Sequence, residues 1–177
     1  HSAVIGPGPP GQYRTPGCMD ETMVNLVTGR ALGLDFGTTN SVVACSNGTP
    51  DPQLVEFVGT HAAGEVFRSA LCFWQDDEVR GGLGYEAGPW AIAEYLDFPQ
   101  GCRFIQSFKT VAASPLFDTA SVFTKRFKFE ELGQRFLERL VGHAGGVLDD
   151  RPARIVVGRP VSYAGARADE GLARERY

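Results

Sequence analysis

The stretch "GLDFGTTNS" (Gly33 to Ser41) decides how the rest of the chain is interpreted. An apolar run ends in Asp35, and a glycine, two threonines and an asparagine follow at once. Gly37 permits backbone conformations that a side chain would forbid, and successive N–H groups at such a turn can surround an anion. A carboxylate beside an anion is favourable only with a cation between them, and Mg²⁺ is often bound by few carboxylates together with phosphates. The stretch therefore predicts a site for a metal-bound polyphosphate, and the alternative is an ordinary hairpin in which Asp35 caps the turn.

The composition of the 177 residues limits the class of protein. A hydrophobic fraction of 43% is enough for a packed core, and a net charge of -4 argues against nucleic acid as a partner. No apolar run approaches the roughly 20 residues of a membrane span, and the N-terminus lacks the features of a signal peptide. The cysteines (Cys18, Cys45, Cys72 and Cys102) are widely spaced, which favours free thiols in a reducing compartment. We therefore expect a cytoplasmic protein without a membrane partner.

Hydrophobic periodicity predicts an α/β fold. Residues 1–29 contain "GPGPPGQYRTPG" and no hydrophobic period, so we expect a disordered extension there. Strands are expected over 31–36, 41–45, 54–58, 69–74, 122–129 and 153–160, and helices over 89–96, 130–148 and 164–177. The first three strands, joined by tight turns, form an antiparallel meander. The last strand follows the longest helix, which indicates a crossover into the interior of a sheet.

Several segments together resemble a known superfamily. "GLDFGTTNS" resembles the first phosphate motif of the actin-like ATPases, in the form seen in seventy-kilodalton heat-shock (Hsp70) chaperones and their divergent bacterial relatives. The segments "EVFRSALCFWQDD" (65–77), "FIQSFKT" (104–110) and "ARIVVGRPVSY" (153–163) resemble later segments of that family in order and spacing. Arg68 stands where the family usually has a proline. The resemblance implies that residues 30–177 form the first lobe of an actin-like ATPase (ribonuclease H-like) fold, which is incomplete.

The resemblance also implies roles for the residues of the first motif. Asp35 would hold a hydrated Mg²⁺ ion. Gly37, Thr38 and Thr39 would hold the β- and γ-phosphates of ATP, and Asn40 would lie alongside.

Two later residues receive roles in the same way. Lys109 would be the catalytic lysine, which steadies the attacking water and the transferring phosphoryl group. Its alternative is a surface lysine on a partly exposed segment. Pro160 would be a hinge, and its alternative is a simple strand terminator.

The family's second phosphate loop, catalytic glutamate and adenosine pocket have no counterpart in the sequence. We therefore expect a fragment truncated at the C-terminus, with weak nucleotide binding and no useful turnover by itself. The implied function is that of an ATP-binding and ATP-hydrolysing domain of an Hsp70-like chaperone, with client proteins and co-chaperones as partners of the intact protein. Two alternatives stay open: a fragment of a sugar or metabolite kinase of the same superfamily, and a non-enzymatic nucleotide-binding module.

Overall fold

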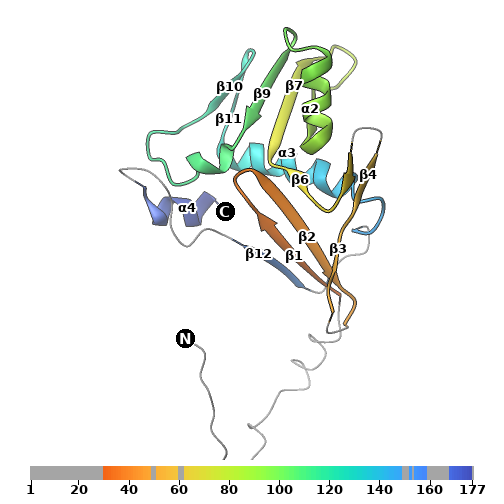
Figure 1. The fold of residues 1–177 in the computed structure, drawn as a ribbon. Coiled ribbons are helices and arrows are strands. Elements are labelled where there is room, and N and C mark those ends of the chain that lie inside the picture. The colour runs from red at the N-terminus through yellow and green to blue at the C-terminus, as the bar shows by residue number, and fades with distance from the viewer. Residues whose placement is uncertain are drawn as a thin grey trace, which may run out of the picture.

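The computed structural model describes residues 30–48, 51–59, 62–148, 152, 154–158 and 168–176. The fold is α/β, as the periodicity predicts, with two main sheets and a helix that lies between them (Figure 1). The expected extension over 1–29 and the expected hinge at Pro160 lie outside the described residues.

The first sheet begins with the predicted antiparallel hairpin. Strand β1 (Ala31–Phe36) pairs with β2 (Asn40–Ser46), and β2 continues to β3 (Gln53–Leu54). Strand β6 (Phe67–Arg68) pairs with the beginning of β2. On the other side, β12 (Arg154–Gly158) pairs with β1 in the parallel direction. The sheet therefore has the order β12-β1-β2-β3.

Strand β12 lies at the edge of this sheet in the described part of the chain, so its predicted interior position is wrong. All five residues of the strand are exposed. Periodicity identifies an apolar strand but cannot tell whether neighbours cover it, because cover depends on the rest of the fold.

The expected strand over 54–58 is also wrong, because the chain divides there into β3 and β4 (Phe57–Gly59). Val55 still donates its N–H to the carbonyl of Val43, at 2.8 Å. The chain then leaves β2, and the Phe57 ring packs on the Phe67 ring with 4.9 Å between centroids. Strand β4 pairs instead with β5 (Ala62–Gly64).

The second sheet has three antiparallel strands in the order β8-β7-β9. The predicted strand over 69–74 corresponds to the central strand β7 (Ala70–Gln75). Strands β8 (Leu83–Ala87) and β9 (Cys102–Gln106) were not predicted. The predicted short helix is α2 (Gly88–Asp97), with a proline in its first turn, and it packs along this sheet.

The expected strand over 122–129 is replaced by a hairpin of β10 (Ala120–Val122) and β11 (Lys125–Phe127). Val122 is paired with Lys125, so the two strands are joined by a two-residue turn. Phe123 lies in this turn with a φ of 52°, in the left-handed region. Two-residue hairpin turns of the favoured types need a positive φ, and an aromatic residue gives no sequence signal for one.

Helix α3 (Phe129–Gly142) connects the two sheets. The Phe136 ring lies 5.2 Å from the Phe36 ring of β1, 5.5 Å from the Phe67 ring of β6 and 5.8 Å from the Phe108 ring. Phe108 begins the short 3₁₀ helix η1 (Phe108–Val111). One aromatic side chain of α3 therefore joins three segments into a common core.

Helix α3 is shorter than the expected helix over 130–148, and residues 143–148 form turns. Gly145 and Gly146 have φ values of 61° and 81°, which a right-handed helix cannot contain. The last helix, α4 (Glu170–Arg176), is the described part of the expected helix over 164–177. No helix in the described ranges is long and apolar enough to cross a membrane.

Candidate functional site

The turn between β1 and β2 requires its glycine. A Cβ atom at Gly37 would overlap with the backbone carbonyl of Asn40, so any side chain would force the turn open. Thr38 and Thr39 form the exposed tip of the turn. The predicted cofactor-binding residues thus lie together on one tight, accessible turn, and the sequence signal for it was the Asp-Phe-Gly-Thr-Thr run.

Asp35 lies on the open face of the first sheet. Phe36, the next residue in β1, points to the opposite face and is buried against α3, whereas Asp35 is exposed. Asp35 is paired with Gly158 of β12, whose lack of a side chain leaves space near the carboxylate. A shallow cavity of about 310 Å³ lies here, lined by Asp35 together with Gly33, Val42, Ala44, Val156 and Gly158.

Lys109 packs against Phe36, at the end of β1 that leads into the turn. Its side chain is only 5% exposed, which excludes a surface lysine, and Nζ lies 5.1 Å from the centroid of the Phe36 ring. Burial lowers the pKa of Lys109 below the ordinary value of 10.5, and the negative charge of Asp35 acts in the opposite direction. The structure therefore brings the predicted metal ligand and the predicted catalytic lysine within electrostatic reach of each other.

The site forms where the two sheets meet. Asp35 and the turn belong to the first sheet, whereas Lys109 belongs to η1, directly after β9 of the second sheet. Ser69, between β6 and β7, connects the two parts. Its hydroxyl donates to the carbonyl of Gly37 at 2.7 Å, and its carbonyl accepts from the N–H of Ser107 at 3.3 Å.

Arg68 is a charged residue of the site to which sequence reasoning gave no role. Its Nη1 donates to Oδ1 of Asn40 at 2.8 Å, so Asn40 holds a cation beside the turn. The sequence did contain a hint of this role, because Arg68 stands at a position where the resembled family usually has proline. Within the described ranges, there is no cluster of three or more histidine, cysteine, aspartate and glutamate side chains suited to hold a metal.

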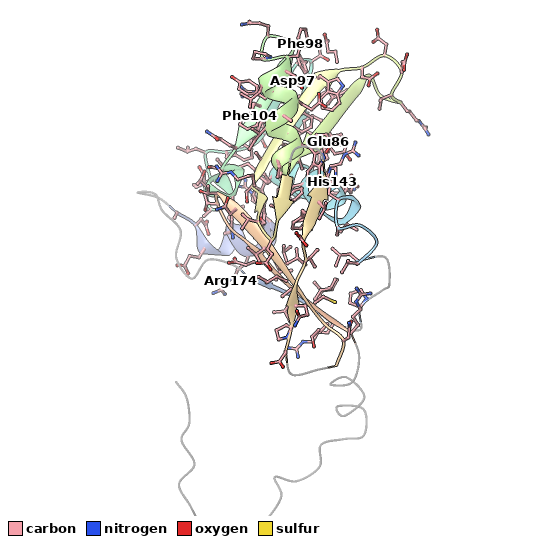
Figure 2. The ribbon with its side chains drawn as sticks, turned by 45° about the vertical axis from the view of Figure 1, so that its right-hand side comes forward. Glu86, Asp97, Phe98, Phe104, His143 and Arg174 are labelled. Atoms are coloured by element: carbon pink, nitrogen blue, oxygen red, sulfur yellow. The ribbon has the colours of Figure 1, made fainter. Side chains whose placement is uncertain are left out.

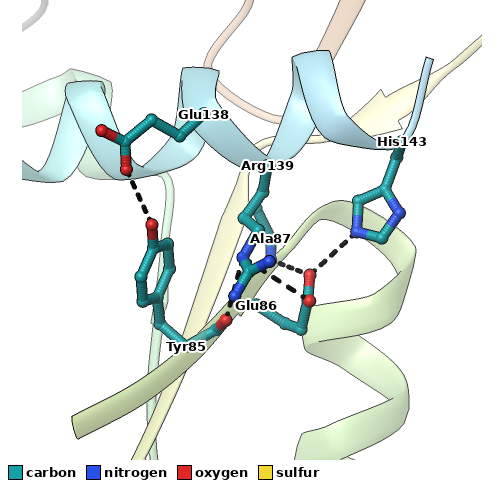
Figure 3. A network of polar contacts seen from close by, with 6 residues as sticks. All are labelled: Tyr85, Glu86, Ala87, Glu138, Arg139 and His143. Atoms are coloured by element: carbon teal, nitrogen blue, oxygen red, sulfur yellow. Dashed lines mark hydrogen bonds and ion pairs between the residues drawn. The ribbon is translucent and has the colours of Figure 1, made fainter. Parts of the chain in front are cut away.

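A second polar network lies between β8 and α3 (Figure 3). Tyr85 donates to Glu138 at 2.7 Å, and Glu86 contacts both Arg139 at 3.5 Å and His143 at 2.9 Å. Burial, followed by the bond to Glu138, raises the pKa of Tyr85, and the same bond lowers the pKa of Glu138. These contacts hold the second sheet to α3 and add nothing to the candidate site.

The prediction of free thiols is confirmed for the cysteines that the structure describes. Cys45, Cys72 and Cys102 are free thiols, and Cys18 lies outside the described residues. Cys72 is fully buried in β7, and burial is the main cause that raises its pKa to about 12.

No protein-family model matches the chain, and no curated protein matches it. A solved structure that resembles it is the non-polymerising A278D mutant of MamK bound to AMPPNP. The two are 16% identical, with a TM-score of 0.42, over 83% of this chain and 37% of that one. The chain thus spans little more than a third of that structure. Its own architecture is a meander extended by a parallel strand that follows a helix.

Proposed function

We propose that the chain binds Mg²⁺-ATP at the turn between β1 and β2, as the first lobe of an actin-like ATPase domain. The observation that carries the proposal is the burial of Lys109 against the Phe36 ring, at the end of β1 that leads into the turn and within electrostatic reach of Asp35. A buried cation at this position could stabilise the negative charge of a polyphosphate bound at the turn. Lys109 would act as the lysine that stabilises the transferring phosphoryl group.

Asp35 fits Mg²⁺ by the chemistry of its surroundings. Mg²⁺ keeps several waters and is usually bound by one or two carboxylates together with substrate phosphates. Asp35 is one exposed carboxylate beside an open cavity, which leaves room for such waters. When bound, the ion would neutralise phosphate charge and so permit an acid beside the phosphate turn.

The remaining residues of the site would hold the phosphates. The N–H groups and hydroxyls of Thr38 and Thr39 are available on an exposed turn. Arg68, held by Asn40, would add positive charge at the same side.

The finer assignment is to an Hsp70-like chaperone ATPase of the cytoplasm, with client proteins and co-chaperones as partners of the intact protein. It rests on the order and spacing of "GLDFGTTNS", "EVFRSALCFWQDD", "FIQSFKT" and "ARIVVGRPVSY". Hydrolysis would then belong to the intact protein, in which two lobes close around the nucleotide.

The first test is binding of a non-hydrolysable ATP analogue to the full chain, by isothermal titration with MgCl₂ and with EDTA. We expect a Kd of about 1 mM or below with Mg²⁺, and Asp35→Asn should remove most of the gain that Mg²⁺ provides. Asp97→Asn is the matched control, since Asp97 is an exposed acid at the far end of α2, away from β1 and β2 (Figure 2). Equal binding with Mg²⁺ and with EDTA would contradict the proposed metal site.

Lys109→Met tests the lysine in the same assay. It should weaken binding of the Mg²⁺ complex about tenfold, whereas Lys125→Met, on the exposed strand β11, should change it less than twofold. The same loss for both variants would indicate only a general effect of positive charge.

A further inference from the structure

We infer that Ser69 is a positioning residue, which holds the phosphate turn and the Lys109 segment in one fixed arrangement. The catalytic meaning of this inference rests on the proposed nucleotide site. Ser69 is only 2% exposed and lies between β6 and β7, where the two sheets join.

Ser69 binds the turn at both of its ends. Its hydroxyl donates to the carbonyl of Gly37 at 2.7 Å, and its N–H donates to the carbonyl of Thr39 at 2.8 Å. Two carbonyls of the turn therefore point inward, toward Ser69. The outer side of the turn is left to the exposed Thr38 and Thr39, which is the side a phosphate would approach.

The hydroxyl proton of Ser69 can be assigned. Ser41 Oγ lies 3.0 Å from Ser69 Oγ, and both side chains are buried. A serine hydroxyl has one proton to donate, and the carbonyl of Gly37 accepts that of Ser69. Ser41 must therefore donate to Ser69, which makes Ser41 an outer member of the chain of hydrogen bonds.

The third polar group of Ser69 holds the lysine segment. Its carbonyl accepts from the N–H of Ser107, which has a φ of 55° in the left-handed region. Such a conformation is unfavourable for residues other than glycine and persists where neighbouring contacts require it. Thr110 adds two bonds to the carbonyl of Ser107, from its N–H at 3.0 Å and its hydroxyl at 2.8 Å. This turn sets the direction in which η1 presents Lys109.

One residue thus fixes two parts of the proposed site that are far apart in the sequence. Buried neighbours hold its backbone, since Phe67 and Leu71 on either side are fully buried. Any displacement of Ser69 would move the turn and Lys109 together. A well-placed site requires this kind of support, because small displacements reduce binding and catalysis.

The test compares Ser69→Ala with Ser41→Ala, a matched loss of one buried hydroxyl. Amide chemical shifts of residues 37–41 and 107–111 would be measured by NMR, and affinity for the Mg²⁺ complex of the ATP analogue by titration. Ser69→Ala should shift amides in both segments and weaken binding about tenfold. Ser41→Ala should leave the amide shifts of residues 107–111 unchanged and weaken binding less than threefold. Its unfolding midpoint should fall by about as much as that of Ser69→Ala, because each variant loses one buried hydroxyl.

Ser69→Cys guards against misfolding of the alanine variant. The cysteine thiol is a weaker hydrogen-bond donor than the serine hydroxyl. Ser69→Cys should therefore give amide shifts and an affinity between those of the original chain and those of Ser69→Ala. Unshifted amides over 107–111 in Ser69→Ala, or equal losses of affinity for both alanine variants, would overturn the inference. If the unmodified chain binds no Mg²⁺-nucleotide, the proposed function fails, and the NMR comparison still decides whether Ser69 couples the two segments.

Discussion

The two sheets differ in how completely they are covered. In the second sheet, residues 70–73 of the central strand β7 are all buried. In the first sheet, all five residues of β12 are exposed, and Ile155 is 61% exposed. The proposed site lies between these extremes, where the open sheet supplies Asp35 and the turn, and the covered sheet supplies Lys109.

The difference teaches how the chain separates stability from chemistry. Phe73, Leu71 and the aromatic residues around Phe136 bury apolar surface, which is the main favourable term in folding. The open face of the first sheet carries the Asp35 carboxylate, and under the proposed function this group must stay in contact with water to bind a hydrated ion. Among the residues that the structure describes, Lys109 is the charged residue that is buried in the covered part.

The largest expected effect is the loss of the connection between the sheets. Phe136→Ala removes a fully buried ring that contacts the rings of Phe36, Phe67 and Phe108, and should lower the free energy of unfolding by about 3–5 kcal/mol. Leu137→Ala, on the exposed side of the same helix, should lose less than about 1 kcal/mol. Urea unfolding of both variants measures the difference, and equal losses would mean that α3 does not join the sheets.

The next effect concerns the turn itself. Gly37→Ala places a Cβ atom against the carbonyl of Asn40 and should lower the free energy of unfolding by about 1–3 kcal/mol. Gly33→Ala is the control in the preceding strand β1, since a Cβ there meets no atom within 4 Å. Its effect should stay below about 1 kcal/mol in the same urea experiment. A tolerated alanine at position 37 would show that the turn is loose.

An alkaline pH should weaken the covered sheet through Cys72. Its pKa is about 12 in the folded chain, against 9.0 ordinarily, so the unfolded chain releases this proton first as the pH rises. The stabilising contribution is complete below pH 9 and is lost as the pH rises toward 12. From pH 8.5 to 10.5, the original chain should lose on the order of 1 kcal/mol more than Cys72→Ala. If the free energies of unfolding of the original chain and of Cys72→Ala, measured under reducing conditions, fell equally with pH, the prediction would be wrong.

Lys109 should act in the opposite direction. Because burial lowers its pKa below 10.5, the unfolded chain binds this proton more readily than the folded chain does. The contribution of Lys109 to stability should therefore increase as the pH rises from its folded pKa to 10.5. Subtracting the unfolding profile of Lys109→Met from that of the original chain isolates this increase. A difference that is constant with pH would mean that the lysine is well solvated.

The smallest effect is expected at the open edge of the first sheet. Val156→Thr keeps the branched shape of a half-exposed residue in β12 and should change the free energy of unfolding by less than about 0.5 kcal/mol. A loss of several kilocalories in urea unfolding would mean that β12 is covered in solution.

The sequence by itself determined the elements whose cause is local. The short spacing between two apolar runs was sufficient to predict the β1–β2 hairpin, and the apolar face containing Leu132 and Phe136 was sufficient to predict α3. The proline in its first turn indicated α2 in the same way. The chemistry of a carboxylate beside an anion-binding turn singled out Asp35, whereas only the resemblance singled out Lys109.

Only the tertiary structure decided which distant segments meet. It divided the strands between two sheets, left β12 at an edge and buried Lys109. It also placed Ser69 against Gly37, which lies 32 residues earlier in the chain. The physical reason is that burial and long-range hydrogen bonds depend on contacts between residues far apart in the chain, which a local pattern of side chains does not encode.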